Sequence, residues 1–215
     1  MKRINVGCGM SPTPGWDNVD NSLSLRLSRL PVLAEILSAF GAIGNAQRSY
    51  IEFCRGAGIQ YADAVRRLPF DDASAGVIYS SHMLEHLSRK QAVAFLAEAR
   101  RVLAPGGIIR IAVPDLAMLH QQYRQSGNAD DFIEGTLMAY EPPETLGRRI
   151  RDVIAGPRHH LWMYDGPSLI KLLTANGFEK AEPQPPGSTT IPDPGALNLY
   201  EREGESVYVE ARRPA

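Results

Sequence analysis

The stretch that organises the chain is residues 1–20, MKRINVGCGMSPTPGWDNVD. Its apolar run at 4–6 ends abruptly in Gly7-Cys8-Gly9, and a second short run at 16–19 ends on Asp20. This order predicts a strand, a glycine loop, a second strand and an acidic residue. Glycines leave bare backbone that a ligand can approach. Ligands of open α/β sheets bind at the carboxyl ends of the strands, so we expect a nucleoside-binding corner here, with Asp20 on the ribose hydroxyls.

The loop departs from the pattern that binds dinucleotides. A third glycine is missing, Pro12 and Pro14 stand where a helix should begin, and Asp20 comes too early. The Lys-Ser/Thr pair of a phosphate loop is also missing. A ligand with a ribose and no phosphate fits better. The same glycines would also serve a tight turn that needs positive φ.

The amino-acid composition limits which classes of protein the chain can belong to. The 215 residues, with 44% hydrophobic and 22% charged content, predict one globular domain over residues 1–215. A formal net charge of -1 gives no electrostatic reason to expect nucleic acid or an anionic membrane surface. Two cysteines make no disulfide framework or metal cluster. Without an apolar signal core or a membrane-spanning run, the expected location is cytoplasmic.

Residues 22–57 predict an inserted pair of helices. Leu30, Leu33, Leu37 and Phe40 recur at helical spacing before the pattern breaks at the following glycines. The segment is either a helical cover on the sheet edge or a lid over the ligand.

Residues 58–115 predict a crossover unit of a parallel sheet. An extended stretch ends on Asp63, and a buried strand ends in Ser80-Ser81-His82. Ser88 begins a helix, with Gln91 completing a capping box. A Pro-Gly-Gly turn then leads to a strand over 108–113 that is followed by Asp115.

Five motifs in this order, INVGCG, GWDNVD, YADAVRRLPFDD, VIYSSHMLEHL and RVLAPGGIIRIAVPD, carry a family resemblance. The chain resembles the class I S-adenosylmethionine-dependent methyltransferases, most closely a type 11-like bacterial group often found among genes for cell-surface glycans. The resemblance implies an α/β fold, a single Rossmann-like seven-stranded, mostly parallel sheet. The last strand would be antiparallel, helices would cover both faces, and a helical insertion would follow the second strand.

The resemblance also implies the cofactor, S-adenosylmethionine, with S-adenosylhomocysteine as product. Asp20 would hold the ribose hydroxyls and Asp63 the adenine amino group. The segment between the first two strands is too short for the family's usual first helix, which normally meets the methionine carboxylate. The other implied cofactor neighbours are Gly7, Cys8 and Gly9 along the methionine, Ala64 beside the adenine, and Ser80, Ser81 and His82 around the sulfonium and acceptor.

Methyl transfer to oxygen benefits from a base near neutral pH, which histidine suits best. His82 is the first candidate and Asp115 the second. Residues 116–215 form the variable region where the acceptor would be chosen. There an Arg-rich stretch, with Arg148, Arg149, Arg151 and Arg158, lies close in sequence to the predicted acceptor residues His159, His160, Trp162 and Tyr164. The same residues would also suit a solvated helix face and core aromatics.

Three other functions compete with O-methylation of a small polar acceptor such as a sugar or glycan precursor. His82 to His86 spells H-x-x-E-H, a zinc-hydrolase pattern that needs a helix already running at His82. A strand tip is expected there, so no metal is predicted. A nicotinamide-dependent oxidoreductase would share the fold but lacks the third glycine. A non-catalytic member of the family would keep the nucleoside pocket and lose the acceptor site. The sequence leaves the oligomeric state open.

Overall fold

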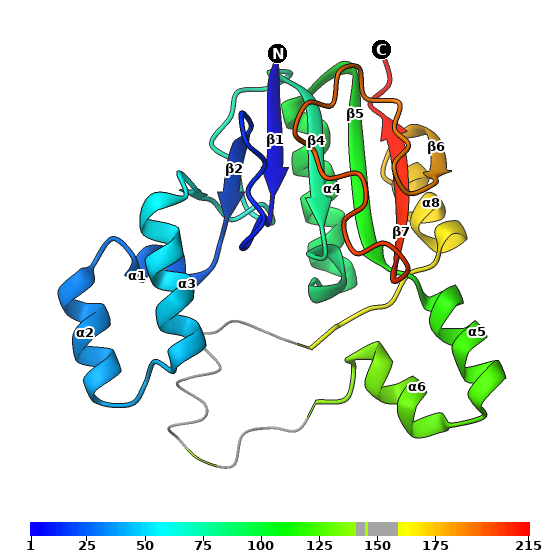
Figure 1. The fold of residues 1–215 in the computed structure, drawn as a ribbon. Helices are drawn as coiled ribbons and strands as arrows, with labels where there is room; N and C mark the ends of the chain where they lie inside the picture. The colour runs from blue at the N-terminus through cyan, green and yellow to red at the C-terminus, as the bar shows by residue number, and fades with distance from the viewer. Residues whose placement is uncertain (141–144, 146–158) are drawn as a thin grey trace.

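The computed structural model describes residues 1–140, 145 and 159–215, and a single mixed sheet forms its centre (Figure 1). The seven-stranded sheet has the order β3-β2-β1-β4-β5-β7-β6, and only the pairs of β7 with its two neighbours are antiparallel. The predicted fold class is therefore confirmed. The strands are β1 (Lys2–Val6), β2 (Asp17–Asp20), β3 (Gln60–Tyr61), β4 (Ala75–Ser81), β5 (Leu103–Pro114), β6 (Glu179–Gln184) and β7 (Ser206–Arg212).

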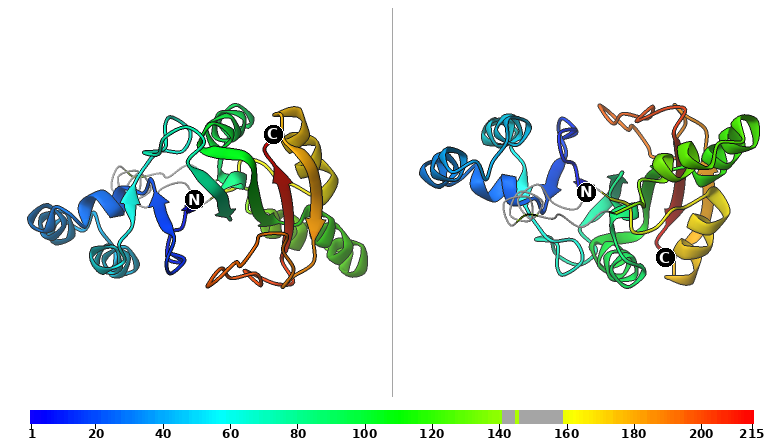
Figure 2. Two further views of the ribbon diagram at one scale, coloured as in Figure 1. Left: turned by 90° about the horizontal axis from the view of Figure 1, so that it is seen from above. Right: turned by 90° about the horizontal axis from the view of Figure 1, so that it is seen from below.

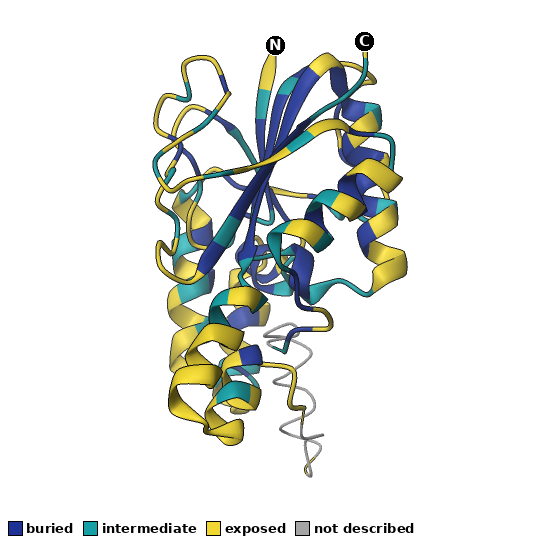
Figure 3. Cartoon of the chain, turned by 90° about the vertical axis from the view of Figure 1, so that its right-hand side faces the viewer, coloured by how far each residue is buried: buried dark blue, intermediate teal, exposed yellow. Residues whose placement is uncertain are grey.

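Helices α4 (Arg89–Val102) and α8 (Gly166–Ala175) pack their apolar stripes on one face of the sheet. Both begin with a capping box, Ser88 with Gln91 and Asp165 with Ser168, which satisfies two backbone donors at each helix start. The predicted Ser88 cap is thus confirmed. Figure 3 shows the buried strands between helices whose outer faces are exposed.

The opposite face of the sheet is covered by an irregular segment over residues 185–205. Ile191 and Leu197 of this segment pack with Trp16 against Val77 and Ile108 of the central strands. Figure 2 shows the segment, in orange, and α4 on opposite sides of the sheet. This irregular, Pro-rich segment therefore supplies part of the core.

A buried ion pair fastens this segment to the sheet. Arg110 Nη1 lies 2.7 Å from Glu210 Oε1, and the two side chains are 0% and 3% exposed. Arg110 also donates to the Ser188 carbonyl, while Thr189 and Thr190 donate to the Glu210 carboxylate. The pair therefore orders residues 188–190 over the centre of the sheet.

The insertion between β2 and β3 contains three helices rather than the predicted pair: α1 (Leu23–Leu27), α2 (Pro31–Ala39) and α3 (Asn45–Gly56). The extra break comes from Pro31, which starts α2. The predicted stripe on α2 is mostly exposed, with Leu33 42% and Phe40 85% accessible. In contrast, α3 buries Ile51 and Cys54.

Beyond β5 the structure holds α5 (Leu116–Ser126) and α6 (Ala129–Thr136), which the sequence did not predict. Helix α5 buries no residue and α6 buries only Thr136, so neither adds a core-facing side to the sheet. The 3-10 helix η1 (Leu84–His86) follows β4. Within the described ranges, no helix combines the length and apolar character needed to cross a membrane.

Candidate functional site

The loop between β1 and β2 is built without a helix in this structure. Asn5 of β1 donates to the Ser11 carbonyl and to Thr13 Oγ1 at 3.1 and 3.0 Å. Asn18 of β2 accepts from the Thr13 amide and donates to its carbonyl. Two asparagines on neighbouring strands thus hold the loop, where a first helix would stand in the family.

Asp20 joins the glycine loop to the second strand. Its carboxylate accepts from the Gly9 amide at 3.1 Å and from the Ser22 amide at 2.7 Å, and the residue is 9% exposed. Gly9 has φ +48°, and a Cβ built on it would meet no atom within 4 Å. The loop backbone therefore faces open space beside a fixed carboxylate.

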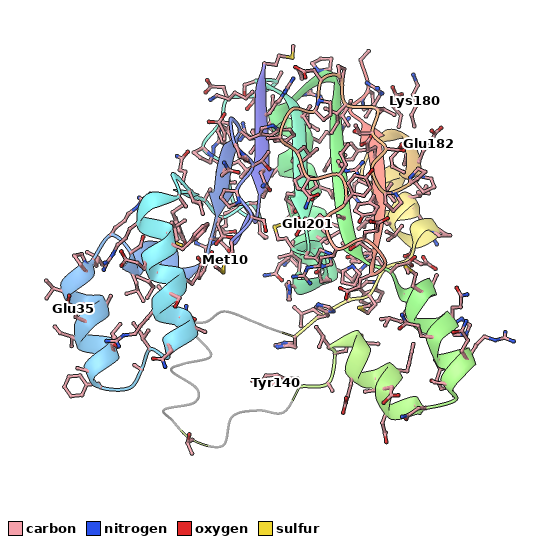
Figure 4. All side chains as sticks on the ribbon, viewed as in Figure 1. Met10, Glu35, Tyr140, Lys180, Glu182 and Glu201 are labelled. Atoms are coloured by element: carbon pink, nitrogen blue, oxygen red, sulfur yellow. The ribbon has the colours of Figure 1, made fainter. Side chains whose placement is uncertain are left out.

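This open space is a cavity of about 330 Å³ at the carboxyl ends of β1 and β4. The volume falls at the lower end of the range of about 300–1,000 Å³ that is typical of small-molecule sites. Met10 and Glu201, labelled in Figure 4, reach it from the glycine loop and from the 185–205 segment. The lining residues are Asn5, Gly7, Cys8, Gly9, Met10, Ser11, Tyr79, Ser81, His82, Glu201 and Arg202.

The structure brings part of the predicted cofactor set to this cavity. The glycine loop, Ser81 and His82 line it, whereas Asp20 stands behind Gly9. Asp63 follows β3 with a side chain 32% exposed, and it accepts from the Val65 amide at 3.1 Å. Ala64 and Ser80 are buried, 6% and 1% exposed, so both lie behind the cavity wall.

His82 is held in an unusual conformation at the cavity wall. Its backbone is left-handed, with φ 49°, a region that non-glycine residues seldom adopt. Nε2 lies 2.8 Å from Ser206 Oγ, and Nδ1 lies 3.4 Å from Glu85 Oε1. Nε2 is therefore held by the Ser206 hydroxyl, whereas Nδ1 makes no hydrogen bond, and the side chain is only 9% exposed.

Asp115 caps a helix. Its Oδ1 accepts from the Ala117 amide at 2.9 Å, at the start of α5. Its backbone also pairs with that of Tyr164. Asp115 is not among the lining residues of the cavity, and its observed role is to cap the start of α5.

The predicted acceptor residues lie on the segment that leads into α8, outside the cavity lining. The Arg89 guanidinium lies over the Trp162 ring at 4.9 Å and donates to the Tyr164 hydroxyl. Tyr164 is 1% exposed and belongs to the main core. His159 packs its ring on Tyr140. The predicted arginines Arg148, Arg149, Arg151 and Arg158 lie outside the described residues.

The H-x-x-E-H motif adopts a one-turn 3-10 helix, so its histidines do not share an α-helical face. Glu85 nevertheless lies among three histidines. His82 Nδ1 is 3.4 Å away, and one nitrogen each of His86 and His160 is 4.0 Å away. Burial lowers the pKa of His160, and Glu85 offsets part of that effect. The grouping of His160 with the motif was not visible in the sequence.

The cavity residues that sequence reasoning missed are of two kinds. Asn5, Met10 and Ser11 flank the predicted loop, and their proximity to Gly7 and Gly9 was the available signal. Glu201 and Arg202 come from a segment about 190 residues away. Long-range contacts place that segment here, among them the Arg110–Glu210 pair, the packing of Ile191 and the bond from the Tyr208 hydroxyl to the Glu201 carbonyl, so no local pattern could have identified these residues.

The cysteine of the glycine loop is expected to be unreactive. Burial, with Asp20 adding to it, raises the pKa of Cys8 to about 12, and burial also raises that of Cys54. The thiolate is the reactive form, so at pH 8 we expect Cys8 to alkylate about a thousandfold more slowly than a free thiol. Mass spectrometry after timed iodoacetamide treatment measures this, with guanidinium-unfolded protein as control. Equal rates in both states would contradict the prediction.

The comparisons with known proteins concern the fold and the domain type. Residues 44–111 match the type 11 family model described as a methyltransferase domain. The chain is similar to a S-adenosylmethionine-dependent methyltransferase of Methanosarcina mazei, with 16% identity, TM-score 0.53, and coverage of 99% of this chain and 92% of that one. It is also similar to a possible histamine N-methyltransferase of Thermotoga maritima, with 14% identity, TM-score 0.52, and coverage of 99% and 82%.

At these identities the solved structures show the fold, while the family model adds the methyltransferase domain. No curated protein gives a significant match. Residues 44–111 therefore match a methyltransferase domain, and the chain shares the fold of solved S-adenosylmethionine-dependent methyltransferases, as the motifs predicted. The cofactor that this match implies is S-adenosylmethionine, for which the open backbone at Gly9 and the carboxylate of Asp20 offer a fitting corner.

Proposed function

We propose that the protein methylates a hydroxyl oxygen of a small polar acceptor, such as a sugar or glycan precursor. One observation carries this proposal: a histidine, His82, at the wall of the cavity that the glycine loop opens. The cofactor supplies an activated methyl group. The protein must then align the acceptor, exclude water and take up the hydroxyl proton.

The surroundings of His82 support its role as the proton acceptor. Strained backbone persists only where surrounding structure enforces it, and it clusters at functional sites. Nε2 faces Ser206 Oγ at 2.8 Å, so a proton can reach the ring directly or through that hydroxyl. Asp115, the second candidate, is occupied as a helix cap, so the proposal rests on His82.

We assign the cofactor contacts as the motifs imply. Gly7, Cys8 and Gly9 would lie along the methionine part, Asp20 would accept from the ribose hydroxyls, and Asp63 would accept from the adenine amino group. Ser80, Ser81 and His82 would border the sulfonium and the acceptor, and Ala64 would lie beside the adenine ring. The cytoplasmic location, the acceptor roles of His159, His160, Trp162 and Tyr164, and the extent of the domain and its insertion stay predictions.

Replacing His82 with alanine should lower methyl transfer by about 10²–10⁴-fold, the usual contribution of a positioned acid–base group. The assay incubates extracts with methyl-labelled cofactor and locates the label by mass spectrometry. His120→Ala, an exposed histidine on α5, is the matched control, and Ser206→Ala tests the relay.

The label should appear in a small molecule or glycan and vanish in His82→Ala. Label in protein or RNA would refute the proposed acceptor class. Transfer that is unchanged in His82→Ala would leave the enzyme class intact and remove this base. Cofactor binding without any transfer would favour the non-catalytic alternative.

A further inference from the structure

Glu85 is a buried carboxylate without a hydrogen bond among the described residues, and its nearest basic neighbour is His82 Nδ1 at 3.4 Å. The residue is 1% exposed, and neither Oε1 nor Oε2 has a hydrogen-bond partner among the described residues. A buried charge without a partner costs several kcal/mol in general, so such groups are normally paired or bind a metal. The proposed methyl transfer assigns no role to this carboxylate.

The backbone around Glu85 holds it firmly in this position. The amides of Leu161 and Trp162 donate to the Glu85 carbonyl at 2.7 and 3.1 Å. These bonds tie η1, at the end of β4, to the segment that leads into α8. Glu85 therefore meets His160, a residue 75 positions further along the chain, in a fixed arrangement.

Two histidines direct their Nε2 atoms at this carboxylate. His86 Nδ1 lies 3.0 Å from the His159 carbonyl, and His160 Nδ1 lies 2.8 Å from the Thr136 carbonyl. A carbonyl only accepts, so each Nδ1 carries the hydrogen and each neutral ring keeps its lone pair on Nε2. Both Nε2 atoms are 4.0 Å from Glu85 Oε1. In the neutral form of both rings, two lone pairs and a carboxylate oxygen face one another, an arrangement that a bound cation would satisfy.

The arrangement has the features of a metal-ligand set. One ligand atom from each of Glu85, His86 and His160 lies within 4.8 Å of the other two. Metal-bound histidines usually donate their second ring N–H to a carbonyl or carboxylate, as both rings do here. Ligand atoms of a tetrahedral zinc lie roughly 3.3 Å apart, given bonds of about 2.0–2.1 Å. The 4.0 Å separations would therefore close by about half an ångström or somewhat more on binding.

We infer that Glu85, His86 and His160 form a site for a divalent transition-metal ion of the zinc type. Two imidazoles and one carboxylate leave a fourth position open. The His86 side chain is 28% exposed and gives access from solvent. This set of ligands differs from the one that the H-x-x-E-H motif would supply, because His160 takes the place of His82. The ion would clamp the segment preceding α8 onto the end of β4.

The test uses metal-stripped full-length protein titrated with ZnCl₂ by calorimetry, with metal content measured after desalting. We expect one zinc per chain and a rise in melting temperature on binding. Cobalt(II) should bind at the same site and give the visible absorption of a low-coordinate ion. Chelator treatment should reverse each effect.

Glu85→Gln and His86→Ala should each weaken zinc binding at least tenfold, whereas the exposed His120→Ala should not change it. Glu85→Gln keeps the side-chain shape and His86 is partly exposed, so both variants should fold. Cofactor binding should persist in His86→Ala, which separates this inference from the proposed function. The site would be overturned if the native chain took up no zinc, or if both ligand variants took up as much zinc as the native chain. A proton shared between Glu85 and a histidine would then account for the arrangement.

Discussion

Glu210→Ala should lower the free energy of unfolding by about 3–5 kcal/mol, the cost of leaving one member of a buried ion pair alone. The Arg110 guanidinium is fully buried and would lose its carboxylate partner. Thr189 and Thr190 would lose their acceptor as well, which frees the segment over the sheet. Urea denaturation monitored by circular dichroism measures the change.

The matched control is Glu182→Ala. Glu182 lies opposite Glu210 on β6, and its side chain is exposed (Figure 4). We expect a change within about 0.5 kcal/mol there, as for most surface positions. A loss below 1 kcal/mol in Glu210→Ala would show that the pair contributes little to holding the covering segment.

The same carboxylate predicts a pH dependence. Burial alone would raise the pKa of Glu210, but hydrogen bonds from Thr189, Thr190 and Arg110 outweigh it, so the pKa lies below the ordinary 4.5. A lowered folded-state pKa means that this stabilisation is present above about pH 4.5 and is lost as the pH falls through the folded value. Glu210→Gln should therefore lose less stability than the native chain on acidification.

Asp20→Ala should weaken S-adenosylmethionine binding by about 1.5–3 kcal/mol, or roughly 10- to 150-fold in Kd. The carboxylate would lose its bonds to the ribose hydroxyls, and the loop would lose the Gly9 amide's acceptor. Calorimetry with S-adenosylmethionine and S-adenosylhomocysteine gives both affinities. Asp63→Ala tests the adenine contact in the same assay.

Asp17→Ala is the control for Asp20, because it removes an aspartate from the same strand. Asp17 pairs with Lys2 at the surface, 3.2 Å apart, away from the glycine loop. Its substitution should leave Kd unchanged. Unchanged affinity in both Asp20→Ala and Asp63→Ala would remove the cofactor-contact assignment.

Sequence reasoning succeeded where short-range chemistry decides the structure. The apolar runs at 4–6 and 108–113 and the Ser88 capping box carry local signals. Parallel strands must end at one edge, so the glycine loop and His82 could be placed at one cavity. The order of motifs then indicated the family.

Long-range packing decided what the sequence could not predict. The extra break in the insertion follows Pro31, and α5 buries no residue. Glu201 reaches the cavity because a buried ion pair holds its segment on the sheet. The burial of Tyr164 among core residues and its bond to Arg89 are visible only in three dimensions.

The position of β7 between β5 and β6 has a consequence for synthesis on the ribosome. β6 bonds only to β7 within the sheet, although β7 follows it in the sequence by more than twenty residues. While the chain is being made, β6 therefore has no strand to join, and the edge of β5 stays open. Unpaired edges of this kind favour association with other chains. Nascent chains stalled before residue 206 should consequently engage chaperones and resist protease poorly, whereas chains extended beyond residue 212 should not.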